Sequence, residues 1–203
     1  VVAMRDCCED TLPPRDGRGS GASWPPYYGR YHAGIPRSTT DDVVAKKSYT
    51  TKGIIPGQAP VIDGDISEAI WDQVSWAGDY IEFQPDENTD PSVQTEFKIL
   101  YDPKNLYLAF RCYDPEPEKI EQRLSRRDGF AGDWIEVNID SYNDKRTAFS
   151  FTITAAGVKG DEFISNNGNN WDSSWNPIWY AKSRIDEKGW TAEIRIPLSQ
   201  LKF

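Results

Sequence analysis

The chain has 203 residues, of which 13% are aromatic, and its 32 acidic and 23 basic side chains give a net charge of −9. This length allows one sizeable hydrophobic core, and the aromatic content is unlike that of a disordered protein. The negative charge repels nucleic acid, so nucleic-acid partners are excluded. No apolar run approaches the roughly 20 residues that cross a bilayer, so no transmembrane segment is expected.

Residues 1–45 are predicted to be a long, irregular arm that precedes the folded domain. Pro and Gly clusters such as Pro13-Pro14 interrupt this region, and no helical or strand period is visible. Its aromatic residues follow a Pro-stiffened backbone that suits binding in a groove. These candidate partner-binding residues are Trp24, Tyr27, Tyr28 and Tyr31. We expect residues 1–36 of the arm to run as a strap across a neighbouring protein, and packing on their own sandwich is the alternative. Cys7 and Cys8 could bond to each other or to a partner.

Residues 46–203 are predicted to form an all-β antiparallel sandwich. Short runs of alternating apolar residues are separated by Gly, Pro, Asn and Asp, which is typical of hairpins. Runs at 93–101 and 106–112 predict one hairpin around the turn 102–105, with Cys112 as a buried small residue. Inward-facing sets are expected at 135–139, 149–153 and 190–196, and core positions are expected for Trp71 and Trp190.

Four segments of this domain resemble carbohydrate-binding module family 9. They are Pro60-Val61-Ile62-Asp63-Gly64-Asp65 with Trp71, Tyr101-Asp102 with Leu106-Tyr107-Leu108, Asp133 to Asp140, and Gly189 to Pro197. The similarity is greatest to the copy of this fold at the N-terminus of large bacterial outer-membrane proteins of unknown function. It implies a jelly-roll or immunoglobulin-like sandwich that could lack its C-terminal strands.

The resemblance also implies a sugar site in which two aromatic rings enclose a terminal sugar and a glutamate binds its hydroxyl groups. Sugar C–H faces stack on aromatic rings, while hydroxyl groups need fixed polar partners. The resemblance assigns Phe130 to the first ring and Glu136 to the glutamate. Strand alternation puts Trp134 on the same face as Glu136. The alternatives are a loop aromatic that packs on the sandwich and a solvated strand glutamate.

Two departures leave this sugar site incomplete. Ser150 stands where the sugar-binding members have a basic side chain, and the second aromatic wall belongs to a segment beyond Phe203. Trp171 or Trp175 could supply a substitute ring, although packing at the rim of the core is the alternative for both.

Metal, haem and catalytic sites receive little support from the residues. The resemblance implies that Asp63, Asp65 and Asp140 could hold a structural calcium ion, but ordinary Asx turns are the favoured interpretation, because the loops lack the repeating acidic spacing of an EF-hand. Met4 and His32 are the only residues of their types and both lie in the arm, so haem binding by the sandwich is excluded. The only histidine lies in the arm and the sequence has no Gly-x-Ser-x-Gly motif, so no catalytic triad can be recognised. No enzymatic activity is expected.

Two functions remain open. The first is a non-catalytic recognition module in the periplasm or outside the cell, which binds saccharide through a degraded site. The second is a structural or adaptor subunit whose arm straps and stabilises a larger membrane-associated assembly. A second aromatic residue facing Phe130, or a partner on the face of Glu136, would discriminate between them.

Overall fold

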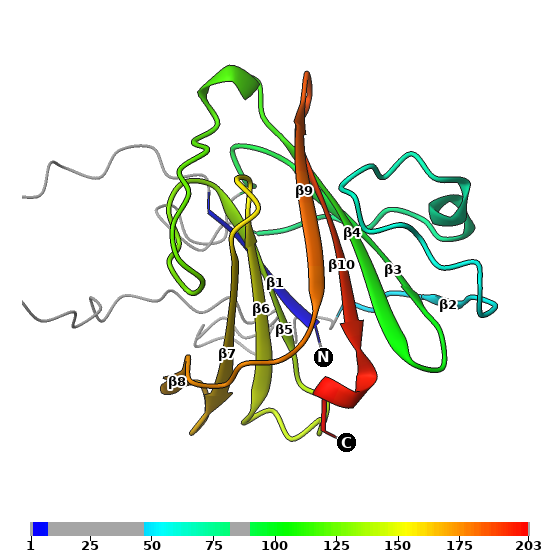
Figure 1. Ribbon diagram of the computed structural model, residues 1–203, viewed down its shortest axis with the longest axis vertical. Coiled ribbons are helices and arrows are strands. Elements are labelled where there is room, and N and C mark those ends of the chain that lie inside the picture. The colour runs from blue at the N-terminus through cyan, green and yellow to red at the C-terminus, as the bar shows by residue number, and fades with distance from the viewer. Residues whose placement is uncertain (1, 8–46, 82–89, 203) are drawn as a thin grey trace, which may run out of the picture.

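The computed structural model describes residues 2–7, 47–81 and 90–202, which fold into two facing five-stranded sheets (Figure 1). Sheet A has the order β1-β5-β6-β7-β8, and sheet B has the order β2-β3-β4-β10-β9. All pairings are antiparallel except the short parallel pair β2–β3. The strands are β1 (Val2–Cys7), β2 (Lys52–Gly53), β3 (Thr95–Tyr101), β4 (Asn105–Tyr113), β5 (Trp134–Ile139), β6 (Ala148–Thr154), β7 (Lys159–Ser165), β8 (Asn170–Asp172), β9 (Tyr180–Asp186) and β10 (Gly189–Pro197).

The only helical elements in the described ranges are short 3₁₀ turns: η1 (Ala69–Gln73), η2 (Pro117–Lys119) and η3 (Leu198–Gln200). None of the helices described is long and apolar enough to span a membrane. The predicted all-β antiparallel sandwich is therefore confirmed.

The β3–β4 hairpin shows how local sequence produces this architecture. The carboxylate of Asp102 accepts hydrogen bonds from the backbone amides of Lys104 at 2.6 Å and Asn105 at 2.7 Å. Such an Asx turn reverses the chain tightly, so that the alternating residues on both sides of it pair in register. The hairpin expected from the sequence is confirmed.

The main core lies between the two sheets and is built from the inward-facing residues of both. Phe151 is fully buried, and its ring lies 5.5 Å from that of Trp175 and 5.3 Å from that of Trp179. Trp190 and Cys112 are buried in the same cluster, as expected. The alternating residues of β5, β6 and β10 therefore form the predicted core.

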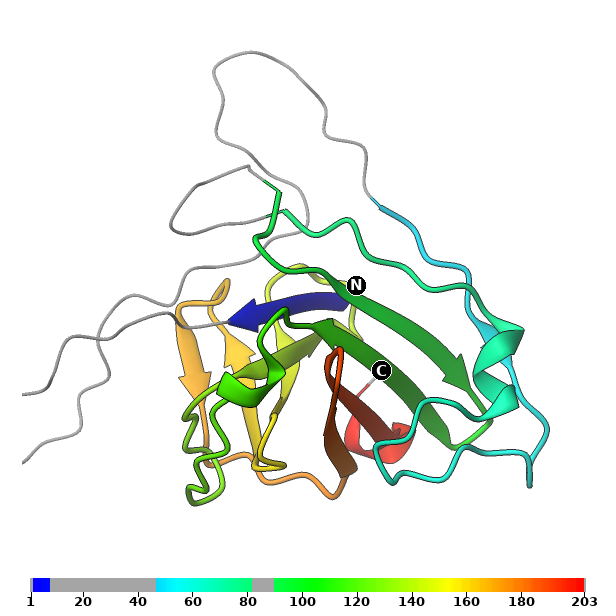
Figure 2. The same cartoon turned by 90° about the horizontal axis from the view of Figure 1, so that it is seen from above.

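A second apolar cluster covers the outer face of sheet B. Trp71 is fully buried there, against Leu100, Tyr107 and Ala109, and not between the sheets. Figure 2 shows the segment from residue 47 to 81, in cyan to teal, running along the outside of the sheet. The strands β3, β4 and β10 of sheet B are therefore covered on both faces over much of their length, which alternation alone did not predict.

Glu193 on β10 connects this covering segment to the sheet. Its carboxylate accepts hydrogen bonds from the indole Nε1 of Trp71 at 2.9 Å and from the amides of Asp63 and Gly64 at 3.0 Å each. Lys98 is also buried on this face, where its Nζ donates to the backbone carbonyl of Trp71 at 2.7 Å. Both polar side chains occupy outward positions of their strands, which simple alternation would place in solvent.

The beginning of the arm belongs to sheet A. Strand β1 pairs with β5 along its whole length, from Val2 opposite Ile139 to Cys7 opposite Trp134. Residues 2–7 of the predicted arm therefore pair with their own domain, to which they add an edge strand. The four aromatic residues proposed for partner binding, Trp24, Tyr27, Tyr28 and Tyr31, lie outside the described residues, as do Cys8, His32 and the rest of 8–46.

Candidate functional site

The outer face of sheet A carries two rows of mostly polar residues that run across β5, β6 and β7. In one row Glu136 pairs with Thr152, and Thr152 pairs with Gly160. The next row consists of Asn138, Ser150 and Glu162. These residues alternate with the inward-facing Val137, Phe151 and their neighbours, so both rows point away from the core.

Phe130 and Trp134 lie on the same face, next to the row of Glu136, Thr152 and Gly160. Their ring centroids are 5.8 Å apart and the rings are tilted by 33°. The ring of Phe130 rests on Gly160, where an added Cβ would come within 2.3 and 2.4 Å of two ring atoms. A residue without a side chain at position 160 thus allows Phe130 to lie on the sheet. The structure brings Phe130, Trp134 and Glu136 to one face, as strand alternation predicted for the last two.

The polar groups of this face are buried and only partly satisfied. Glu136 is 4% exposed and Ser150 is 1% exposed, so Glu136 is not the solvated strand glutamate of the alternative interpretation. The amide Nδ2 of Asn138 donates to Oε1 of Glu136 at 2.5 Å. Within the described ranges, Oδ1 of Asn138 and Oγ of Ser150 are buried without a hydrogen-bond partner. Buried polar atoms in folded proteins nearly always have a partner, so these two atoms leave unused hydrogen-bonding capacity on this face.

Glu162 is a member of this site that the sequence analysis did not identify. It is half-buried on β7, opposite Ser150. Burial raises the pKa of its carboxyl to about 7, and the nearby carboxylates of Glu136 and Asp128 contribute in the same direction. Strand alternation could have placed Glu162 on the outer face beside Ser150. The raised pKa of Glu162 could not be predicted in this way, because it depends on neighbours from several segments.

The two loop tryptophans considered as a second ring lie on different faces. Trp171 on β8 pairs with Ile164, which shares the outer face with Glu162 two residues earlier on β7. Its Nε1 donates to the carbonyl of Gly168 at 3.1 Å. The ring of Trp175 lies 5.0 Å from that of Phe149 and belongs to the rim of the inner core. The structure therefore places Trp171 with the polar rows and Trp175 on the opposite side of the sheet.

The three aspartates considered for calcium lie in two separate loops. Oδ1 of Asp63 accepts the amide of Asp65 at 2.9 Å, and Oδ2 of Asp65 contacts Nη1 of Arg184 at 3.1 Å. Asp140 follows β5 in the other sheet and accepts the amides of Asp144 and Lys145. These contacts are those of ordinary Asx turns. In the ranges that the structure covers, no three Asp, Glu, His or Cys side chains form a group that could hold a metal ion.

Comparison with known proteins agrees with the fold. Residues 62–203 match the family described as carbohydrate family 9 binding domain-like. A comparison of the sequence with curated proteins found no match.

Three solved structures have a similar fold. A family 9 carbohydrate-binding module from Caldicellulosiruptor kristjanssonii in complex with glucose is 22% identical, covers 74% of this chain and 70% of its own, and has a TM-score of 0.52. A family 9 module from that organism in complex with cellotriose is 21% identical, and the match covers 75% of this chain and 68% of the module, with a TM-score of 0.54. A candidate carbohydrate-binding protein from Bacteroides uniformis is 14% identical, with 75% and 73% coverage and a TM-score of 0.56. The family match spans most of the chain, and the chain therefore belongs to the carbohydrate family 9 binding domain-like family.

Proposed function

We propose that this protein is a non-catalytic recognition module that binds saccharide on the outer face of sheet A. The observation that carries the proposal is the polar row of the buried Ser150 and the half-buried Asn138 and Glu162, two atoms of which lack a hydrogen-bond partner among the described residues. The aromatic residues Phe130 and Trp171 flank this row on the same face. Polar groups between two aromatic side chains match the chemistry of a sugar ring, which has apolar faces and polar edges.

Each polar residue has a distinct role in this proposal. Sugar hydroxyl groups can donate to Oδ1 of Asn138 and to the carboxylate of Glu136, and the hydroxyl group of Ser150 can both donate and accept. Glu162 titrates near neutral pH, so it can present either a donor or an acceptor to the ligand.

The site differs from that of the sugar-binding members that the sequence resembles, and we propose that it is degraded relative to theirs. Ser150 provides a neutral hydroxyl group where a basic side chain is expected, and Trp171 provides the second ring from β8. A neutral ligand end suits Ser150 better than an anionic one, because this face carries the acidic side chains Glu136 and Glu162. We propose that the module acts outside the cytoplasm, where polysaccharides are accessible.

Titration calorimetry with glucose, cellotriose and other neutral oligosaccharides tests this function. Phe130→Leu and Glu136→Gln should each abolish binding or weaken it at least about tenfold, since stacking and hydroxyl capture act on one ligand. Tyr113→Leu is the matched control, because it removes a partly exposed ring from sheet B and should leave binding unchanged. Absence of heat with all neutral sugars would overturn the proposal.

The pairing of β1 with β5 favours a second candidate function, that of an adaptor in a larger, membrane-associated assembly. An extended segment from far away in the sequence completes the edge of sheet A, and this is the geometry by which a strand from another chain can also bind a sheet. In this alternative, residues 2–7 exchange with a strand of a partner. A peptide of residues 1–10 added in excess should then exchange into the protein, whereas an intact β1–β5 pair that resists exchange would count against the adaptor.

A further inference from the structure

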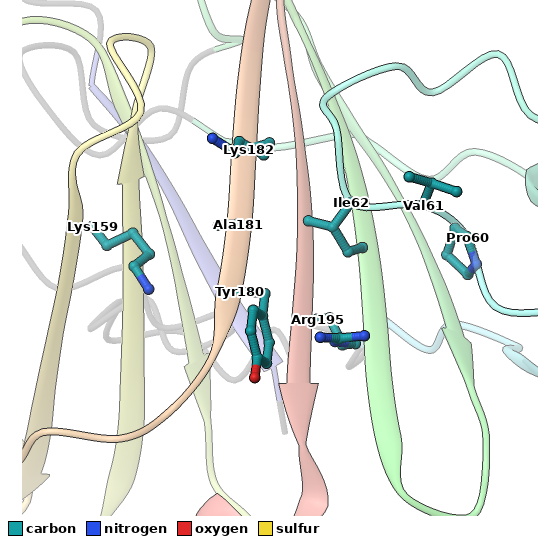
Figure 3. A pocket seen from close by; sticks show the side chains of 8 residues that line it. All are labelled: Pro60, Val61, Ile62, Lys159, Tyr180, Ala181, Lys182 and Arg195. Atoms are coloured by element: carbon teal, nitrogen blue, oxygen red, sulfur yellow. The ribbon is translucent and has the colours of Figure 1, made fainter.

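A pocket opens at the β9 edge of sheet B, away from the polar rows of sheet A. Its volume is about 380 Å³, which is within the range of small-ligand sites. Figure 3 shows the side chains around it, which come from β7, β9, β10 and the segment 60–62. Tyr180 pairs with Arg195 across β9 and β10, and both project from the outer face of the sheet.

Three side chains that line this pocket are cationic: Lys159, Lys182 and Arg195. Among the described residues none of them forms an ion pair with a carboxylate. The nearby carboxylates are otherwise engaged, since Asp161 is paired with Arg127 and Glu193 accepts three hydrogen bonds from the covering segment. In a chain with a net charge of −9, this pocket thus gathers positive charge that attracts anions, and Nζ of Lys159 also donates to the carbonyl of Trp179 at 2.9 Å.

The guanidinium group of Arg195 is positioned by an aromatic ring. Its Cζ lies 4.0 Å from the centroid of the Tyr180 ring, and its buried Nε has no hydrogen-bond partner in the part of the chain that the structure describes. A stacked, half-buried guanidinium has already lost much of its freedom and part of its hydration. An anion that reaches it is therefore attracted more strongly than by an exposed lysine.

Apolar surface adjoins these charges. Tyr180 is 46% exposed and Val61 is 61% exposed, and both line the pocket next to Ile62. Sugar rings present C–H faces that pack on such surfaces, whereas a simple inorganic anion gains nothing from them. The combination of cations with an exposed aromatic side chain thus favours a ligand that has both a carboxylate and a ring.

We propose that this pocket binds a uronic acid residue of an acidic saccharide. Arg195 and Lys182 hold the carboxylate, Lys159 adds positive charge from β7, and Tyr180 with Val61 contacts the sugar ring. The site is separate from the face proposed for neutral saccharides, because the two lie on the outer faces of different sheets.

Calorimetric titration of the full chain with trigalacturonate tests the proposal. Binding should weaken as salt is added, because it depends on charge. Arg195→Gln should weaken binding at least about tenfold, and Lys182→Gln about fivefold. Lys182 is exposed, so this variant remains informative if Arg195→Gln fails to fold. Lys188→Gln is the matched control, since it removes an exposed lysine from the β9–β10 turn, and it should leave the affinity unchanged.

Further experiments distinguish this site from the alternatives. Phe130→Leu should abolish binding of neutral sugars and leave trigalacturonate binding unchanged, so the two proposals can fail independently. No binding of trigalacturonate, or equal binding by the wild type and Lys182→Gln, would overturn the uronate site. Hexaglutamate that binds as tightly as trigalacturonate would overturn the saccharide assignment in favour of an acidic peptide.

Discussion

Replacing Glu193 with glutamine should make the stability of this protein less dependent on pH. Glu193 is fully buried, and its carboxylate accepts one hydrogen bond from Trp71 and two from the Asp63-Gly64 backbone. Burial raises the pKa of this carboxyl to about 7, although the three hydrogen bonds act in the opposite direction.

The sign of the effect follows from proton binding. The pKa of Glu193 is about 7 in the folded state and near the ordinary value of 4.5 in the unfolded state, so the folded state binds more protons between these values. The free energy of unfolding therefore falls as the pH rises through this window. A difference of about 2.5 pKa units corresponds to at most about 3 kcal/mol for this one group.

Urea unfolding of the wild type and of Glu193→Gln at about pH 5 and about pH 8 measures this contribution. At the lower pH the variant should be less stable by about 1–2 kcal/mol, because an amide group accepts fewer hydrogen bonds than the carboxyl. At the higher pH the difference should shrink or reverse, since glutamine cannot ionise. Glu187→Gln, in the exposed β9–β10 turn, is the control that should keep the wild-type pH dependence. A variant at position 193 that loses stability with pH as steeply as the wild type would refute the reasoning.

Other parts of the fold give three further expected outcomes. Phe151→Ala should lower the free energy of unfolding by about 3–5 kcal/mol, because it leaves a cavity in the core. Ser150→Ala should change it by less than about 0.5 kcal/mol, because its hydroxyl group has no partner to lose. Comparable losses for the two variants in denaturant unfolding would contradict this. Gly160→Ala should displace the ring of Phe130 and weaken binding of neutral sugars at least about fivefold, and unchanged affinity in calorimetry would show that the ring is not part of the site. Hydrogen exchange of the isolated protein should show protected amides within Val2–Cys7, and full exchange there would mean that β1 does not stay paired with β5.

The sequence predicted the sandwich because most of its strands have one apolar face and end at recognisable turns. The Asx turn at Asp102 and the inward set around Phe151 are signals of this kind, and both depend only on nearby residues. The same alternation failed for Glu193 and Lys98, because the segment 54–76 covers their side of sheet B. Strand β1 was missed for a related reason, since its pairing partner β5 lies more than a hundred residues away in the sequence.

The candidate site was predictable to the extent that strand alternation determines it. Trp134 and Glu136 share a face because they are two residues apart on one strand. Trp175 could not be separated from Trp171 by sequence, since it follows a short strand in a loop without a period and turns into the core. The raised pKa of Glu162 depends on burial and on carboxylates from other segments, which no local pattern reveals.

The central position of β10 has a consequence for how this protein tolerates mutation. β10 lies between β4 and β9, and seven of its nine residues are buried, on both faces of the sheet. Its neighbour β9 instead alternates between exposed and half-buried residues at the edge of the sheet. A saturation mutagenesis screen for folded protein should therefore find β10 intolerant at nearly every position, including the polar Thr191 and Glu193. In β9 the tolerated positions should recur at every second residue. Natural variants of this protein should therefore carry more substitutions in β9 than in the adjacent β10.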